Sequence, residues 1–213
     1  MDKNLLWYLE KKVQRTIEGL KKNNMEGYYV KDEVELKEKL KELLKQNSTV
    51  TVGGSMTLFE TGVIDYLRSG EYNFLDRYDE ELSPADLKKL YRDAISADTY
   101  ICSTNALTES GELYNIDGRG NRVAAMMFGP DQVIIIAGVN KIVKNLEEAE
   151  TRIKTLAAPV NARRLNKNTT CAKLGYCAEC TTDERICSAY VVLKRQLIKG
   201  RIKVIIVGKE LGY

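Results

Sequence analysis

Two short apolar runs constrain the fold more than any other feature of this sequence. Val133–Ala137 and Ile202–Val207 have the length of strands, and neither alternates apolar with polar residues. A strand of this kind buries both of its faces, which is typical of a parallel sheet covered by helices on its two sides. Helical patterns lie between the strand-like runs. The sequence therefore predicts an α/β fold, a mostly parallel sheet with helices on both faces.

The expected elements alternate along most of the chain. Segment 1–26 has apolar residues three and four positions apart, which predicts an amphipathic N-terminal helix. Helix starts are marked by capping residues at Asp32, at Thr57 with Glu60, and at Ser83 before Pro84. The helix starting at Ser83 is expected to bury a stripe from Leu87 to Ile95. The other expectations are a helix at 146–156 ending before Pro159, strands at 27–30, 49–52, 74–78, 98–102 and 112–116, and an ambiguous segment at 121–128.

Length and composition limit the class of protein. The 213 residues fit one domain, and no apolar run is long enough to span a bilayer. Lysines interrupt the N-terminal apolar residues, so no signal peptide and no membrane attachment are expected, and a cytoplasmic location is predicted. The chain has no histidine, which excludes Ser-His-Asp and Cys-His catalysis. Acid–base chemistry would fall to Asp, Glu, Lys, Tyr or Cys.

Charge is distributed unevenly. Residues 160–213 hold 11 Lys+Arg and 4 Asp+Glu, a net charge of +7, whereas residues 1–159 have a net charge of −4. Such an excess is most often a solvated basic face, and the functional alternatives are an anionic substrate or an acidic partner. No nucleic-acid-binding pattern accompanies it, so no nucleic-acid partner is predicted.

Loops after predicted strands contain the candidate ligand-binding residues. Ligands of open parallel sheets bind at the carboxyl ends of the strands, and a glycine turn before a helix leaves N–H groups free for an anion. Ordinary strand–helix turns and a surface hairpin are the alternatives. No P-loop and no complete dinucleotide fingerprint is present, so no nucleotide cofactor is predicted. The candidates are Gly53, Gly54, Ser55, Thr57, Thr104, Asn105, Asn121, Arg122, Asn140 and Lys141, with Asp117 beside Arg122.

Segment 160–188 is polar, rich in cysteine and without either periodicity, and it is expected to be a long C-terminal loop. Its cysteines, Cys171, Cys177, Cys180 and Cys187, have the spacing C-x5-C-x2-C-x6-C. Four thiolates suit tetrahedral zinc or a [4Fe–4S] cluster, and the spacing does not decide between them. The alternatives are four free thiols or a redox pair at Cys177 and Cys180. Cys102 lies in an apolar strand and is expected in the core.

Blocks in order along nearly the whole chain resemble those of the LUD (DUF162) family of lactate-utilisation proteins. They are residues 52–58, 103–108, 115–122, 138–142, 157–159, 171–187 and 207–213. The resemblance implies a single LUD domain over 1–213 with a CoA-transferase-like fold, shared with sugar-phosphate isomerases and glucosamine-phosphate deaminases. It implies that the glycine/serine loop at Gly53–Thr57 binds a phosphate or acyl group. CoA transferases use a glutamate nucleophile, for which Glu109 and Glu112 are candidates, with Asp117 as a further catalytic candidate. Many similar relatives lack the four-cysteine segment.

Three functions follow from these observations. The first is an accessory or catalytic subunit of lactate or hydroxyacid oxidation that works with iron–sulfur partner proteins, as the resemblance implies. The second is an isomerase, lyase or CoA/acyl transferase acting on a small phosphorylated or carboxylate substrate. The third is a non-catalytic ligand-binding scaffold whose cysteine segment is closed by zinc. The oligomeric state is left open by the sequence.

Overall fold

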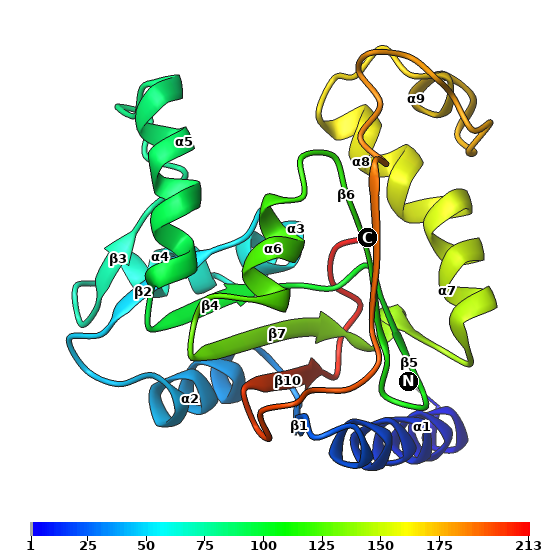
Figure 1. Ribbon diagram of the computed structural model, residues 1–213. Coiled ribbons are helices and arrows are strands. Elements are labelled where there is room, and N and C mark those ends of the chain that lie inside the picture. The colour runs from blue at the N-terminus through cyan, green and yellow to red at the C-terminus, as the bar shows by residue number, and fades with distance from the viewer. Residues whose placement is uncertain (1) are drawn as a thin grey trace.

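A computed structural model describes residues 2–213, so residue 1 of the predicted 1–26 helix lies outside the description (Figure 1). The centre of the molecule is a six-stranded sheet in the order β1-β10-β7-β4-β2-β3, in which every neighbouring pair is parallel. The predicted α/β fold with a mostly parallel sheet is confirmed. Its strands are β1 (Glu26–Val30), β2 (Thr49–Val52), β3 (Asn73–Leu75), β4 (Thr99–Cys102), β7 (Gln132–Gly138) and β10 (Ile202–Val207).

The two doubly apolar strands lie side by side in the middle of this sheet. Successive side chains of a strand point to opposite faces, so each of these strands contributes to two cores. Val133 and Ile135 of β7 pack in one core with helices α1 (Lys3–Lys22) and α6 (Asn121–Met127). Ile134 and Ile136 pack in the other core with α2 (Glu33–Leu43), α3 (Met56–Glu60) and α4 (Val63–Arg68). All four side chains are fully buried. Helices therefore cover both faces of the sheet, as the apolar runs predict.

The helices have the following bounds. They are α1 (Lys3–Lys22), α2 (Glu33–Leu43), α3 (Met56–Glu60), α4 (Val63–Arg68), α5 (Pro84–Asp93), α6 (Asn121–Met127), α7 (Leu146–Arg152), α8 (Ala158–Arg164) and α9 (Thr170–Leu174), with short turns at η1 (Ala94–Ser96), η2 (Val139–Lys141) and η3 (Ile153–Ala157). The ambiguous segment 121–128 is mostly helix α6. In the described residues, no helix is both long enough and apolar enough to cross a membrane.

A second sheet of four strands, in the order β8-β5-β6-β9, stands beside the first. Only β6 was expected, because the other strands are short or only half-buried. The tip between β5 and β6 lies against α1, where a Cβ on Gly111 would come within 2.3 Å of the Gly19 carbonyl carbon. The strands of this sheet are β5 (Ala106–Thr108), β6 (Leu113–Asp117), β8 (Ile142–Val143) and β9 (Ala189–Leu193).

Several local predictions were wrong for identifiable reasons. Thr57 does not cap α3, because Ser55 occupies the N-cap position and Thr57 lies inside the helix. The helix from Leu146 does not end before Pro159. A π-helical turn at η3, in which the Ala158 N–H donates to the Ile153 carbonyl, joins α7 to α8. This change of register lets a proline, which has no N–H to donate, follow without breaking the helix.

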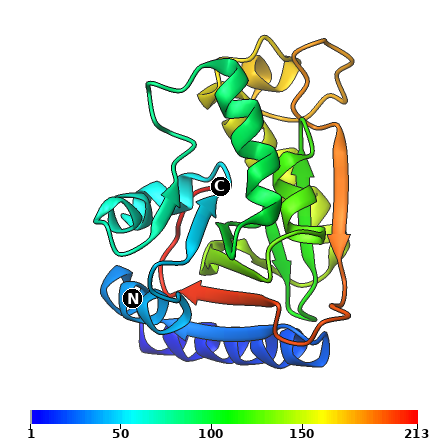
Figure 2. The same ribbon diagram turned by 60° about the vertical axis from the view of Figure 1, so that its left-hand side comes forward.

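Two further expectations need correction. Segment 160–188 is not a continuous loop, because it contains the end of α8 and all of α9. Helix α5 begins at the Ser83 capping box as predicted, yet it buries none of its residues. It rises from the sheet edge on the side opposite α8 and α9 (Figures 1 and 2).

Candidate functional site

A cleft of about 360 Å³ lies at the carboxyl edge of the parallel sheet. Loops after β2, β4 and β7 reach it, as does the loop that joins β6 to α6. The end of the chain, marked C in Figure 1, also lies at this edge, and Tyr213 lines the cleft. The predicted residues that line the cleft are Gly54, Ser55, Thr104, Asn105, Asp117, Asn121, Arg122 and Lys141.

Arg122 organises one wall of the cleft. Its guanidinium is buried and pairs with Asp117, with 2.7 Å between Nη2 and Oδ1. It also donates to the Asn115 and Asn105 side-chain oxygens at 2.6 and 2.9 Å. The other Asp117 oxygen accepts the Arg122 and Val123 backbone N–H groups at the start of α6. Because these donors are already engaged within the protein, Arg122 holds the wall in shape.

Lys141 lies on the floor of the cleft. Its side chain comes from η2, directly after β7, and the residue is 2% exposed. Its Nζ donates to Thr57 Oγ1 and to Ser103 Oγ, each at 3.0 Å. Burial, together with the positive charges of Arg152 and Arg122, lowers the pKa of this amine to about 7. At neutral pH a large fraction of the lysine is therefore the uncharged amine.

The Gly53-Gly54 turn lies against two cationic side chains, Arg122 and Arg77. A Cβ on Gly53 would lie 2.7 Å from the Tyr100 hydroxyl oxygen and 3.2 Å from Arg122 Cγ. Gly54 faces the guanidinium of Arg77, which lies over the Tyr91 ring and donates to the Tyr91 hydroxyl at 2.7 Å. Gly53 thus makes room for side chains of this protein, and the guanidinium of Arg77 places a positive charge at the cleft.

The last residues of the chain form another part of the lining. Asn140 accepts the Leu211 N–H at 3.1 Å and donates to the Gly212 carbonyl at 3.2 Å. These two hydrogen bonds, called here the Asn140 bracket, hold Tyr213 in the cleft lining. Within residues 2–213, the buried hydroxyls of Tyr213 and Ser55 have no hydrogen-bond partner. Buried polar atoms are normally paired, so both hydroxyls are available to a ligand.

Three predicted ligand-binding residues do not line the cleft but support residues that do. Gly53 makes room for Arg122, Thr57 holds Lys141, and Asn140 holds the end of the chain. Glu109 and Glu112 lie elsewhere, at the tip between β5 and β6, where Glu109 pairs with Arg15 and Glu112 approaches Lys194. Neither glutamate lines the cleft. Of the catalytic candidates, only Asp117 does.

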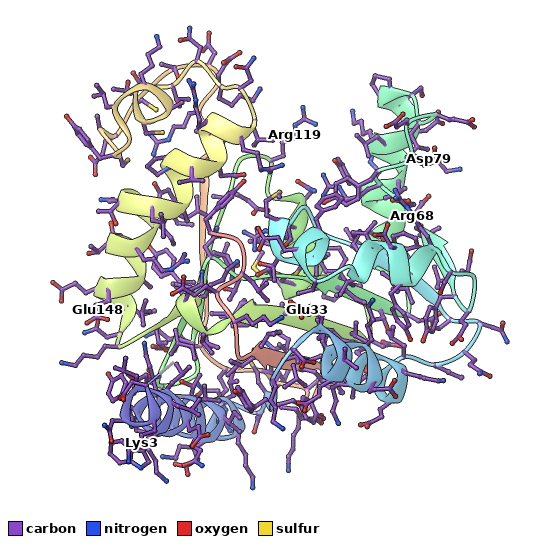
Figure 3. All side chains as sticks on the ribbon, turned by 180° about the vertical axis from the view of Figure 1, so that it is seen from behind. Lys3, Glu33, Arg68, Asp79, Arg119 and Glu148 are labelled. Atoms are coloured by element: carbon purple, nitrogen blue, oxygen red, sulfur yellow. The ribbon has the colours of Figure 1, made fainter. Side chains whose placement is uncertain are left out.

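Sequence reasoning missed several cleft residues. Arg119 lies at the tip of the loop joining β6 to α6, on the side towards which α5 and α8 extend (Figure 3). Arg164 and Lys167 belong to the basic C-terminal part of the chain, and this charge excess was the signal that could have found them. Arg77 and Tyr91 had no such signal. The missed lining residues also include Asn161 and Tyr213.

The four cysteines of the 160–188 segment line one small cavity of about 20 Å³. All are free thiols. In the Cys177–Cys180 turn, Glu179 has a left-handed backbone (φ 48°) and its N–H points to Cys177 Sγ at 3.4 Å. Across residues 2–213, however, no three His, Cys, Asp or Glu side chains are already arranged to hold a metal ion. The four cysteines therefore lie around one cavity, but in the described residues their sulfur atoms are not arranged as the ligands of a metal ion.

Arg185 closes the cysteine segment on itself. Its guanidinium donates to the Cys187 carbonyl at 2.7 Å and to the Cys180 carbonyl at 2.8 Å. Burial and the neighbouring thiols raise the pKa of Cys187 to about 11. Ile186, between these two residues, lines both the cysteine cavity and the cationic cleft, and its backbone lies against Gly118. The two cavities therefore share a wall.

Known proteins resemble this chain in sequence and in fold. A crystal structure of a DUF162 family protein from Deinococcus radiodurans is similar over 94% of this chain and 98% of that chain, with a TM-score of 0.55 and 14% identity. Ribose 5-phosphate isomerase from Plasmodium falciparum matches over 53% of this chain and 52% of its own, with a TM-score of 0.34 and 18% identity. No curated protein sequence matches. The sequence profile of the LUD domain matches residues 13–207, so the chain belongs to the LUD domain family.

Proposed function

We propose that the cleft binds a small anionic metabolite, a carboxylate in keeping with the lactate-utilisation family. The observation that carries this proposal is the charge of the lining. In the part of the chain that the structure describes, Asp117 is the one acidic side chain of the lining, and it is neutralised by Arg122. The cationic side chains beyond this pair are Arg77, Arg119, Arg164 and Lys167.

Hydrogen-bonding capacity and size support the same proposal. The unpartnered hydroxyls of Ser55 and Tyr213 would donate to ligand oxygens, and a buried donor without a partner is costly to leave unpaired. A volume of about 360 Å³ suits a metabolite of modest size. Carboxylates and phosphates both offer several oxygens to such a site.

This binding would serve the oxidation of lactate or another hydroxyacid in the cytoplasm, with iron–sulfur proteins as redox partners. The support for this role is that the chain belongs to the LUD domain family, which is associated with lactate utilisation. The alternative is catalysis by the chain itself, as an isomerase, lyase or acyl transferase. It is favoured by the meeting of Ser55, Asn105, Asp117, Arg122 and Lys141 in one cleft. Residues distant in the sequence would then form one reaction site.

Calorimetric titration with lactate, pyruvate, ribose 5-phosphate and CoA tests the proposal. Binding of at least one of them is expected, and Arg77→Gln should weaken it by about tenfold or more, because a charge-assisted hydrogen bond is lost. Arg92→Gln is the matched control, since Arg92 is exposed on α5 and lies outside the lining. Absence of binding, or equal weakening by both exchanges, would contradict the proposal.

A second candidate function is metal binding by the four cysteines. They line one cavity, and the N–H–to–sulfur contact in the Cys177–Cys180 turn is favourable to a thiolate. Four thiolates are the complete ligand set of a tetrahedral zinc ion and also that of a [4Fe–4S] cluster. Zinc bound there would order the 160–188 segment.

Elemental analysis of anaerobically purified protein separates the possibilities. About one zinc per chain is expected, and Cys187→Ser should lower the zinc content. Cys102→Ala, which removes a core thiol far from this cavity's lining, should leave the content unchanged. Protein without metal would contradict this function, and about four irons per chain with broad visible absorbance would identify a cluster in place of zinc.

A further inference from the structure

Lys141 is a buried amine held by neutral groups. Arg122, the other buried cation beside the cleft, pairs with Asp117. The partners of Lys141 within residues 2–213 are the hydroxyls of Thr57 and Ser103. An ammonium ion without a carboxylate is costly to bury, and a neutral amine is not. The site is therefore built to hold lysine in its nucleophilic form.

The hydroxyls also fix the direction of the amine. Thr57 Oγ1 lies 3.4 Å from the Leu211 carbonyl, and Ser103 Oγ lies 3.4 Å from the Thr104 carbonyl. When each hydroxyl hydrogen points to its carbonyl, each hydroxyl oxygen accepts one N–H of Lys141. Two N–H groups and Cε then occupy three of the four positions around Nζ. The fourth position carries the lone pair, and the amine lies in the cleft lining.

Four neighbouring ionisable groups influence the pKa of this amine. Arg152 on α7 and Arg122 on α6 oppose its protonation, whereas Glu60 on α3 and the Cys102 thiol on β4 favour it weakly. Desolvation is the largest influence, and the pKa falls to about 7. An exposed lysine keeps a pKa of about 10.4 and is almost wholly protonated at that pH.

We propose that Lys141 Nζ forms a covalent imine with the carbonyl group of a small anionic ketone bound in the cleft. The lone pair of the amine attacks the carbonyl carbon, and the carbonyl π pair moves to oxygen. The resulting carbinolamine loses that oxygen as water, which takes away the two hydrogens of the amine and leaves a C=N bond. No oxidant or reductant is required. The inference rests on the proposed anion-binding function, because the cationic lining would hold the carboxylate or phosphate of the ketone.

Borohydride trapping tests the imine. Intact protein is incubated separately with pyruvate and with dihydroxyacetone phosphate, reduced, and examined by mass spectrometry and peptide mapping. One adduct per chain is expected, on the peptide that contains Lys141. The ketone that labels the protein shows whether the site takes an oxo acid or a phosphate ester. Adducts scattered over exposed lysines would overturn the inference.

Two variants and a pH series sharpen the test. Lys141→Met should abolish the adduct, and Lys144→Met, an exchange of an exposed lysine three residues away, should preserve it. The trapping rate should rise with pH to a plateau just above about pH 7, whereas an ordinary lysine would keep gaining rate to about pH 10. Peptide mapping locates the adduct in the protein without any substitution. The test therefore does not depend on whether Lys141→Met folds.

Calorimetry with the same two ketones separates the inference from the proposed function. Binding of a ketone without a trapped adduct would refute imine formation and leave anion binding intact. Neither binding nor an adduct would refute both. A plateau that lies near pH 10 would also refute the inference, because it would show an ordinary amine.

Discussion

Replacement of Lys141 by methionine should change the pH dependence of stability in a defined direction. The amine has a pKa of 10.5 when solvated and about 7 in the folded protein. Between these values the unfolded chain binds a proton that the folded chain does not, so the stability of the native protein rises with pH. Below about pH 7 both states are protonated, and the full penalty for burying the charge remains.

The magnitude follows from the two pKa values. A fall from 10.5 to about 7 corresponds to a penalty of about 5 kcal/mol at low pH. At about pH 6 nearly all of this penalty applies, and at about pH 9 only about 2 kcal/mol of it is left. Methionine carries no charge at either pH. The free energy of unfolding of the native protein, relative to Lys141→Met, should therefore increase by about 3 kcal/mol between the two pH values.

Urea titrations of both proteins at the two pH values measure this difference. The hydroxyls of Thr57 and Ser103 lose their partner in the variant, which costs about 1 kcal/mol each, but this cost does not depend on pH and cancels. Similar slopes in urea would show that both proteins unfold in the same way. A difference in stability that stays constant to within about 0.5 kcal/mol would refute the depressed pKa and, with it, the argument for a neutral amine.

Three further predictions concern the wall of the cleft, the contact with α1, and the ligand. Arg122→Gln should lower the free energy of unfolding by about 3–5 kcal/mol in urea, because Asp117 would be left as an unpaired buried charge, and Asp117→Asn in the same chain should recover part of the loss. Gly111→Ala should lower the melting temperature far more than Gly70→Ala; both glycines have positive φ, but only the first would press a Cβ against the Gly19 backbone. The affinity for the anionic ligand, measured by calorimetry, should fall as salt is added, and an affinity independent of salt would contradict a charge-dominated site.

The centre of the sheet was predictable because burial on both faces leaves a strong sequence signal. Val133–Ala137 and Ile202–Val207 could be neither surface strands nor helix faces, and they lie next to each other in the sheet. The carboxyl-edge rule predicts that Ser55, Asn105 and Lys141 lie at one edge of the sheet, and in the structure all three line one cleft.

The remaining parts of the site depend on contacts that no local pattern reveals. Arg77 comes from a loop after an edge strand and reaches the cleft because two tyrosine rings support it. Tyr213 reaches it through the Asn140 bracket. Glu109 was suggested by analogy of residue type alone, and it instead forms an ion pair with Arg15. Pro159 misled the helix prediction because a π turn is set by packing and not by propensity.

The wall shared by the two cavities has a thermodynamic consequence. Ile186 lies between Arg185 and Cys187, whose contacts hold the cysteine segment, while its other side borders the cleft. A change at the thiols that displaces Ile186 alters the cleft, and a ligand that presses on Ile186 alters the thiols. Linkage makes any such effect reciprocal: the factor by which occupancy of the cleft changes metal affinity equals the factor by which metal changes ligand affinity.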